Sequence, residues 1–383
     1  MKNRQNNWQK IKLGDAAGEV RNLYNPSPGE HLKYIGLEHI KQNTLRLSSI
    51  GDSADTQSAK KFFSTNDVLF GSLRAYFRKV VKPKFNGVCS TDITVLRSKN
   101  GNDQNFLYYF IANPHFIDFA AASAEGTRMP RVSWKFLSKT QWNFPPSVDQ
   151  KRISDILSAF DDKIELNNKI SRTLEQTAQA IFKEWFGKSE KLKAKSEKLF
   201  KLGKIICGKT PSKSNLKYFG GEIPFIKIPD MHNQMFILKT EDSLTEVGAD
   251  SQKNKFIPRN SICVSCIATV GLVSITTKDS QTNQQINTII PKSESYLEFL
   301  YLALKTIKND LMLIGSGGST TLNINTSIFS NIEILVPGEE VIDKFHKLAN
   351  PMFNKILQIN KENQKLVALR DLLLPKLMRG EIV

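Results

Sequence analysis

Residues 157–185 read LSAFDDKIELNNKISRTLEQTAQAIFKEW, and residues 349–377 read ANPMFNKILQINKENQKLVALRDLLLPKL. In both stretches, mostly apolar residues recur at alternating spacings of three and four, which is typical of coiled-coil helices. The first series is Leu157, Phe160, Ile164, Asn167, Ser171, Leu174, Ala178, Ile181 and Trp185; the second is Ala349, Met352, Ile356, Ile359, Asn363, Leu366, Arg370, Leu373 and Leu377. We predict two long helices packed as an antiparallel coiled coil. The alternative is an amphipathic helix packed only on its own domain.

The two stretches belong to a repeat of the whole chain at an offset of about 192 residues, as between Lys163 and Lys355. Lys12-Leu13-Gly14 recurs as Lys201-Leu202-Gly203, and Phe106-Leu107-Tyr108 recurs as Phe299-Leu300-Tyr301. Because such matches keep their order along the chain, they indicate two copies of one unit. Two large copies favour a pseudo-two-fold arrangement over a solenoid.

Each copy combines a globular part with one long helix. Short β-branched segments such as 93–96 and 262–264 predict strands, and 106–119 and 296–313 have helical spacing. The expected fold class is therefore α+β, with two similar globular domains separated by the two long helices. We expect the first domain at 1–145, its helix at 146–187, the second domain at 188–337 and the last helix at 338–383. Residues 188–199, in which KSEKL occurs twice, are expected to form a linker or a frayed helix end; the alternative is a DNA-binding tail.

The charge of the chain favours a polyanionic partner. Its net charge is +17, and nearly all of the excess lies in 1–145 and 188–337 rather than in the helices. The alternative is a scaffold protein whose basic charge is incidental. The start of the chain lacks the apolar core of a secretory signal, and the longest uncharged run, 260–277, is too polar to span a bilayer. Four cysteines in 383 residues indicate a reducing compartment without a disulfide framework.

Two segments of the first copy carry the residue types that contact DNA. Gly71–Lys79 follows a predicted strand and mixes cations with aromatic rings, and Gly126–Arg131 is a second basic loop. Arginine suits guanine edges, whereas lysine and hydroxyl groups suit phosphate. We expect DNA contacts from Arg74, Tyr76, Arg78, Lys79, Thr127, Arg128 and Arg131; the alternative is a solvated surface.

The second copy has amide-rich and hydroxyl-rich segments instead. Asparagine and glutamine can bind adenine through two hydrogen bonds. We expect DNA contacts from Asn283, Gln284, Gln285, Ser319, Thr320, Thr321 and Asn323. Polar loops without any ligand are the alternative.

No motif supplies a complete catalytic site, and we expect neither a metal nor a cofactor. Cys263 and Cys266 have no second cysteine pair and no nearby histidine, so strand packing is favoured over zinc or redox chemistry. Asn113-Pro114-His115-Phe116 resembles the motif with which amino-methyltransferases hold a flipped base, but no methyl-donor loop accompanies it. A helix-interrupting turn explains it better. Gly315–Gly318 lacks the Lys-Ser/Thr of a phosphate-binding loop.

Three segments resemble one protein family. Ala178–Phe186, following Leu166–Ile170, looks like the end of the central helix of type I restriction–modification specificity subunits, and Leu372–Ile382 is similar to the C-terminal ending of that family. Gly126–Val132 resembles the glycine-rich segment of its target-recognition domains. The second copy departs from this pattern, because Gly318–Ile324 contains no arginine.

The resemblance implies a non-catalytic DNA-reading subunit. Each target-recognition domain would read one half of a split, asymmetric DNA site, and the paired helices would hold the domains apart and dock two methyltransferase subunits, joined by restriction subunits. We expect partner docking by Ile181, Phe182, Trp185, Phe186, Leu373 and Leu377. The expected location is the bacterial or archaeal cytoplasm, at the nucleoid. The enzyme alternative is an adenine methyltransferase or a nuclease fusion.

Overall fold

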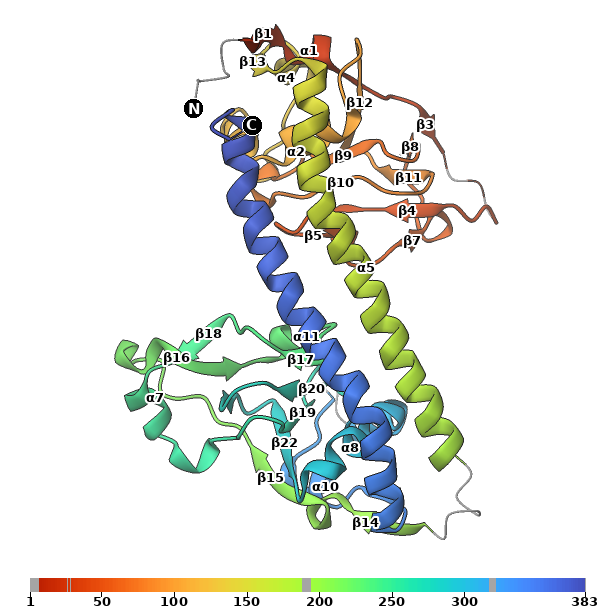
Figure 1. Cartoon of the computed structure of the whole chain (residues 1–383), viewed down its shortest axis with the longest axis vertical. Helices are drawn as coiled ribbons and strands as arrows, with labels where there is room; N and C mark the ends of the chain where they lie inside the picture. The colour runs from red at the N-terminus through yellow and green to blue at the C-terminus, as the bar shows by residue number, and fades with distance from the viewer. Residues whose placement is uncertain (1–6, 26, 28, 188–193, 317–321, 383) are drawn as a thin grey trace. The chain divides into compact units, whose positions relative to one another are not determined.

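The computed structural model describes residues 7–25, 27, 29–187, 194–316 and 322–382. The chain forms two compact units, which we call unit 1 (Met1–Ile164 with Lys365–Val383) and unit 2 (Glu165–Gln364). Each of the two long helices, α5 (Ser147–Phe186) and α11 (Glu339–Met378), contributes one segment to each unit (Figure 1). We describe each unit by itself.

Unit 1 contains a four-stranded sheet in the order β10-β9-β12-β2 and a five-stranded sheet in the order β3-β8-β11-β4-β7, with the pairs β1-β13 and β5-β6. Its strands are β1 Gln9–Lys12, β2 Ala17–Glu19, β3 Leu23–Tyr24, β4 Lys33–Ile35, β5 Ile40–Lys41, β6 Arg46–Leu47, β7 Gly51–Asp52, β8 Lys60–Phe63, β9 Val68–Gly71, β10 Val80–Val81, β11 Gly87–Ser90, β12 Ile93–Ser98 and β13 Gln141–Phe144. Its shorter helices are α1 Leu13–Ala16, α2 Gln104–Ala112, α3 Pro114–Ala122 and α4 Trp134–Leu137.

Unit 2 contains a five-stranded sheet in the order β15-β22-β19-β20-β17, a three-stranded sheet in the order β18-β16-β21, and the pair β14-β23. Its strands are β14 Lys195–Lys198, β15 Gly203–Cys207, β16 Phe219–Ile226, β17 Phe236–Ile237, β18 Asp242–Leu244, β19 Ile262–Ser265, β20 Val273–Thr276, β21 Gln281–Thr282, β22 Ile286–Pro291 and β23 Glu333–Val336. Its shorter helices are α6 Ile228–Met231, α7 Glu246–Asp250, α8 Leu297–Thr306, α9 Lys308–Gly315 and α10 Thr326–Ser330.

The same series of elements occurs in both units. The order β9, β12, α2, α3, α4, β13, α5 in the first half of the chain recurs as β19, β22, α8, α9, α10, β23, α11 in the second half. The two long helices keep a constant offset, since Ser147 corresponds to Glu339 and Phe186 to Met378. The α+β class and the internal repeat predicted from the sequence are therefore confirmed.

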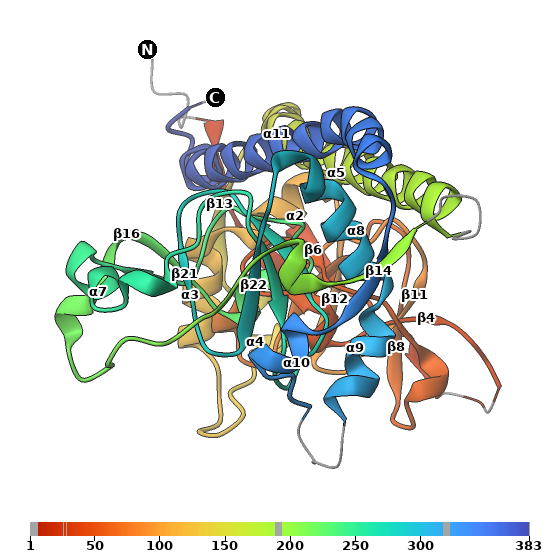
Figure 2. The same ribbon diagram turned by 90° about the horizontal axis from the view of Figure 1, so that it is seen from below.

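The long helices pack together within each unit. In unit 2, the Asn167 side chain donates to Asn363 Oδ1 at 2.9 Å, and the ring of Phe182 lies 5.9 Å from that of Phe345. The residue numbers run in opposite directions, so these segments are antiparallel, as predicted. The buried asparagine pair is the kind of polar seam contact that fixes helix register. Helix α8 lies beside the long helices (Figure 2), and its Phe299 contacts Phe182 and Phe186 of α5.

The linker expected at 188–199 is shorter than predicted. Residues 195–198 form β14, which pairs antiparallel with β23 from Lys195–Val336 to Lys198–Glu333. Leu199 is fully buried in the core of unit 2. The sequence of this segment is typical of a polar linker, because an edge strand also carries exposed charged side chains.

Candidate nucleic-acid interface

The two basic segments of the first copy meet in space, although they lie far apart in the sequence. Leu73 and Arg131 form an antiparallel backbone bridge, and the Arg74 amide donates to the Pro130 carbonyl at 2.8 Å. The Arg74 guanidinium also donates to the Arg128 carbonyl at 3.3 Å. The structure therefore joins Gly71–Lys79 and Gly126–Arg131 into one surface of unit 1, which we call loop pair 1.

The first segment of loop pair 1 is held in an uncommon backbone conformation. Arg74 and Arg78 flank a short 3₁₀ turn at Ala75–Phe77, and both have a left-handed φ of 52°. Non-glycine residues adopt this conformation at a cost, and such strain concentrates at functional sites. The turn leaves Tyr76 52% exposed and Arg74 exposed.

The cations of loop pair 1 differ in what already binds them. Arg78 pairs with Asp118 at 3.0 Å, and the Lys79 ammonium donates to the Leu37 carbonyl at 2.6 Å. Thr127 and Arg128 are exposed at the tip of a hairpin closed by backbone hydrogen bonds between Glu125 and Arg131. Arg74 and Arg128 are thus better placed for a ligand than Lys79.

Sequence reasoning missed Asp92, which holds Arg131. Its Oδ1 accepts from Arg131 Nη2 at 2.9 Å and from Nε at 3.0 Å, and its carbonyl accepts from the Ser72 hydroxyl at 2.7 Å. Asp92 directly precedes β12, which pairs with β9, so it lies beside the end of β9 where loop pair 1 begins. In the sequence alone, an acidic residue before a strand does not indicate a role in binding; the role of Asp92 becomes visible only once β12 is known to pair with β9.

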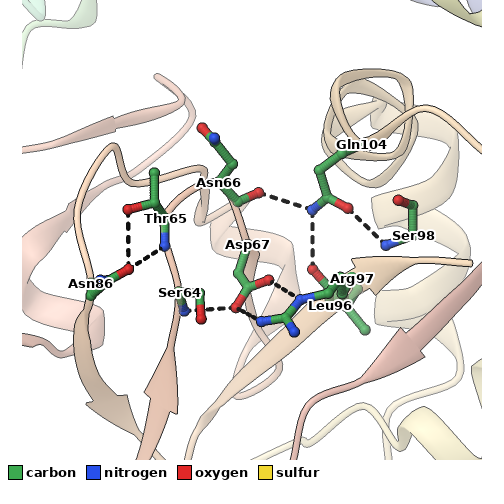
Figure 3. A network of polar contacts seen from close by, with 9 residues as sticks. All are labelled: Ser64, Thr65, Asn66, Asp67, Asn86, Leu96, Arg97, Ser98 and Gln104. Atoms are coloured by element: carbon green, nitrogen blue, oxygen red, sulfur yellow. Dashed lines mark hydrogen bonds and ion pairs between the residues drawn. The ribbon is translucent and has the colours of Figure 1, made fainter.

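The opposite end of the same strand pair is locked by a polar network (Figure 3). Asp67, just before β9, accepts two hydrogen bonds of 2.8 Å from the Arg97 guanidinium and one from the Ser64 amide. Hydrogen bonding to Asp67 raises the pKa of Arg97, so the guanidinium stays charged. Gln104 joins the backbone at Asn66 and Ser98 to the start of α2. The network anchors β9 and β12, which carry loop pair 1 at their other end.

The second copy repeats the loop junction with other side chains. Ile267 and Asn323 form an antiparallel bridge at the position of Leu73 and Arg131, and the Cys266 amide donates to the Gln285 carbonyl at 2.8 Å. The structure thus brings Ser280–Gln285 together with Asn323 through the end of β19; we call this surface loop pair 2. Ser319, Thr320 and Thr321 lie outside the described residues.

Not all amides of loop pair 2 face outward as expected. Asn283 is only 8% exposed, and its amide donates to Gln285 Oε1 at 2.9 Å while its Oδ1 accepts from the Gln285 amide. The Asn283 amide is thus held within its own turn, as short polar side chains often are. Gln284 and Asn323 are exposed.

Sequence reasoning also missed the loop after β15. Thr210 donates its hydroxyl to Gln284 Oε1 at 2.8 Å, and the Lys209 amide donates to the Thr282 carbonyl. A side chain at Gly208 would lie 2.1 Å from Thr282 Oγ1, so only glycine permits this approach. The exposed Lys209 side chain thus adds a cation to loop pair 2.

The motifs that hinted at catalysis have structural roles. Asn113 ends α2 and caps α3, with its Oδ1 accepting from the His115 amide at 3.3 Å, which is the helix-interrupting turn. Cys263 and Cys266 are buried, and burial raises the pKa of the two thiols to about 12 and about 11. Within the described residues, no group of three or more His, Cys, Asp or Glu side chains could hold a metal ion.

Comparison with known proteins identifies the family. Residues 5–176 and 194–364 both match the family model described as the type I restriction modification DNA specificity domain. The chain belongs to the type I specificity subunits. The HindI specificity subunit of Haemophilus influenzae is 36% identical over 98% of this chain and 99% of that protein. The MjaIX specificity subunit of Methanocaldococcus jannaschii is 25% identical over 74% of this chain and 70% of that protein.

The fold is shared with a solved structure. The S subunit from M. genitalium superposes with a TM-score of 0.61 at 17% identity, covering 97% of this chain and 96% of the other. This specificity subunit is thus a non-catalytic DNA-recognition component with two target-recognition domains, which sets the enzyme alternative aside. Among the described residues, no helix has the length and apolarity needed to cross a membrane.

The docking residues expected on the helices of the specificity subunit face its own cores. Phe182 is 8% exposed and Leu377 2%. Ile181, Trp185 and Phe186 pack against the core of unit 2, and Leu373 packs against that of unit 1. Phe182 and Leu377, two of the predicted docking residues, are therefore buried by their own chain. A heptad pattern marks the buried face of a helix and cannot say whether the same chain buries it.

Other apolar side chains of the two helices are exposed. In unit 1 these are Val148, Ile156, Leu369 and Leu372, and in unit 2 they are Leu166, Ile170 and Leu348. Ile156 and Leu348 occupy corresponding positions of α5 and α11 and have similar exposed fractions, 37% and 41%. The repeat thus places one exposed apolar residue at the same helical position in each copy.

Proposed function

We propose that unit 1 and unit 2 each read one half of a bipartite, asymmetric DNA site. The observation that carries this proposal is the repeated junction: Leu73–Arg131 and Ile267–Asn323 occupy corresponding positions, yet the side chains around them differ in chemistry. Loop pair 1 presents guanidinium groups and a tyrosine, whereas loop pair 2 presents amides. Because guanidinium groups prefer guanine and amides prefer adenine, the two half-sites differ in sequence.

In unit 1, Arg74, Arg128 and Arg131 are the base-reading candidates, and Arg78, Lys79, Tyr76 and Thr127 contact the backbone or stack. The exposed positions of Arg74, Arg128 and Arg131 support this division. Asp92 holds the Nε side of the Arg131 guanidinium and orients it, whereas Arg78 and Lys79 are less exposed and bonded to Asp118 and Leu37. In unit 2, Gln284 and Asn323 read bases, Gln285 and Asn283 shape the turn, and Lys209 contacts phosphate. Ser319, Thr320 and Thr321 complete this second set.

Residues 1–145 and 194–337 serve as the target-recognition domains, and the helices act as the spacer between half-sites. The length of α5, 40 residues, corresponds to about 60 Å at 1.5 Å per residue. One turn of B-DNA is about 34 Å. A helix of this length is therefore sufficient to set a gap of unread base pairs between the two half-sites.

The chain works as a part of a type I restriction–modification complex. We assign its partners as two methyltransferase subunits and restriction subunits, acting on double-stranded DNA at the nucleoid in a bacterial or archaeal cytoplasm. Ile156 and Leu348 support the number of methyltransferase subunits, since equivalent exposed residues in two copies offer two equivalent docking positions. We propose that loop pair 1 and loop pair 2 bind DNA without a cofactor.

Methylation mapping tests the proposal. Cells that carry this chain with its cognate methyltransferase subunit should methylate one motif with two different specific halves and a fixed gap between them. A continuous motif, or two identical halves, would contradict the assignment of different half-sites to the two units. Cells that carry the methyltransferase subunit alone serve as the control and should show no such motif.

A further inference from the structure

A single charged side chain is buried among the described residues of the two long helices. Arg370 is 1% exposed, and in unit 1 its Nη1 lies 2.5 Å from Asp161 Oδ1. Asp371 Oδ1 accepts from Arg370 Nε and Nη2 at 2.9 Å and 2.8 Å, and Asp161 Oδ2 accepts from the Tyr109 hydroxyl at 2.7 Å. Each of the three guanidinium nitrogens is therefore hydrogen-bonded, by groups that belong to unit 1.

The surroundings keep this guanidinium charged. Burial alone would lower the pKa of Arg370, but Asp161 and Asp371 outweigh it and the pKa is raised. A buried charge is tolerated only with its partner, and removal of the partner is strongly destabilising. Ion pairs and polar pairs at helix seams are best known for selecting register and partner rather than for adding stability.

The corresponding positions of the other copy are apolar. With Ser147 aligned to Glu339 and Phe186 to Met378, Asp161 corresponds to Phe353 and Arg370 to Ala178. Phe353 and Ala178 are 2% and 0% exposed and belong to the core of unit 2. The corresponding buried positions thus form an ion pair in unit 1 and apolar packing in unit 2.

This difference separates the observed pairing from its symmetric alternatives. Because α5 and α11 are repeats of one another, α5 could pair with α5 of a second chain in the same antiparallel register. Asp161 would then lie opposite Ala178, with no cation. In a pair of α11 helices, the Arg370 guanidinium would lie opposite Phe353, with no carboxylate from the partner helix.

We propose that the Asp161–Arg370 pair is a pairing determinant, by which α5 selects α11 of its own chain over a second copy of either helix. Asn167 and Asn363 form a second buried polar pair that the symmetric pairings would also break, since Asn167 would face Ser171 and Asn363 would face Ile359. The other buried residues of the two helices are apolar or uncharged and distinguish the pairings less. The partner that is rejected is a second copy of this specificity subunit. The inference rests on the repeat and on the seam, and it is independent of which bases the loops read.

The test is exchange between two differently tagged copies of the full chain that are produced together. The test variant, Tyr109→Phe/Asp161→Phe/Arg370→Ala, gives unit 1 the seam residues of unit 2, and the tyrosine change avoids leaving a hydroxyl without its acceptor. Replacing a buried ion pair with apolar residues is often neutral or stabilising, so this variant is expected to fold. The matched control, Tyr109→Phe/Asp162→Phe/Arg152→Ala, keeps the tyrosine change and moves the other two changes to exposed positions of α5.

The wild type and the control should elute with the mass of one chain and carry over little of the second tag. The test variant should carry over at least about tenfold more of the second tag and show the mass of two chains. If the wild type and the test variant carry over equal amounts of the second tag, whether little or much, the proposal is overturned. Circular dichroism identifies a variant that fails to fold, and Tyr109→Phe/Asp161→Leu/Arg370→Leu then carries the same test.

Discussion

Leu73 pairs with Arg131 through their backbones, and Ile267 pairs with Asn323 in the same way in the other half of the chain. In each unit the pair joins the loop after one strand to a loop that follows two helices. Both units have the same backbone junction, whereas the side chains around it differ between them. A scaffold of this kind can change its target sequence without changing its core.

Arg131→Ala should alter the reading of one half-site only. Loss of a bidentate arginine–guanine contact costs about 1–3 kcal/mol of discrimination. We expect this loss for the half-site of unit 1, with the other half-site unchanged. Competition binding with DNA altered in one half at a time, using the chain in its methyltransferase complex, measures both. Arg152→Ala, an exposed change on α5, is the control; equal weakening of both halves by Arg131→Ala would assign that residue to folding or to phosphate contact.

Asp92→Asn should increase affinity for nonspecific DNA and reduce discrimination. The substitution keeps the shape of the side chain but removes the charge that holds the Arg131 guanidinium at 2.9 Å. A released arginine that gains one phosphate contact steepens the log–log salt dependence by about 0.9. Titrations at several salt concentrations measure the slope, with Asp155→Asn on α5 as a control of equal charge. If the two variants give the same slope, Asp92 does not restrain Arg131.

Asp67→Ala should loosen the strands that carry loop pair 1. The carboxylate is 2% exposed and accepts from Nε and Nη2 of Arg97. A hydrogen bond to a charged group contributes about 1.5–3 kcal/mol to the free energy of unfolding. Because the Arg97 side chain is half exposed and solvent screens it, we expect a loss of about half that size. Hydrogen exchange at amides of β9 and β12 should accelerate, while amides of unit 2 stay unchanged. Arg21→Ala, which breaks an exposed pair with Glu19, should leave all of them unchanged.

Ile156→Glu and Leu348→Glu should each weaken the binding of one methyltransferase subunit. A charge on an exposed apolar position leaves the fold intact but disfavours an apolar interface. Native mass spectrometry of the complex should show a complex with one methyltransferase subunit for each single variant and loss of both for the double variant. The control, Lys151→Glu, changes an exposed charge on the same helix. Full binding of both subunits by the double variant would remove these residues from the docking surface.

The helices and the repeat were predictable because their signals are periodic. Leu157 and Ala349 begin matched series with heptad spacing, and such spacing is a local property of the sequence. Asn167 and Asn363 stood out as polar residues in an apolar series, and the structure pairs them.

The site was predictable only in part, since its assembly depends on long-range contacts. Arg74 and Arg131 could be selected by residue type, but their meeting requires the pairing of β9 with β12, which no local pattern encodes. Asp92 and Thr210 gave no signal for the same reason. The burial of Phe182 and Leu377 in their own units could not be predicted, because an apolar helix residue gives the same sequence pattern whether its own chain or a partner buries it. The hydrogen bond from the Asn283 amide to Gln285 depends on the turn that it forms and gave no signal either.

The spacer role of the helices is the central claim, and it is tested by lengthening both of them at once. Four residues inserted between Ile164 and Glu165 in α5, and four between Gln364 and Lys365 in α11, fall at the boundary of the two units and leave each unit intact. The insertion adds about 6 Å and turns the helix by about 40° beyond a full revolution. Two residues at the same places turn it by about 200° and serve as the matched control.

Methylation mapping of cells that carry each chain with its methyltransferase subunit is the most direct measurement. At about 3.4 Å per base pair, the four-residue variant should methylate the same two half-sites with a gap longer by one or two base pairs. The two-residue variant should lose coordinated methylation. An unchanged gap in the four-residue variant would show that the helices do not set the distance between half-sites.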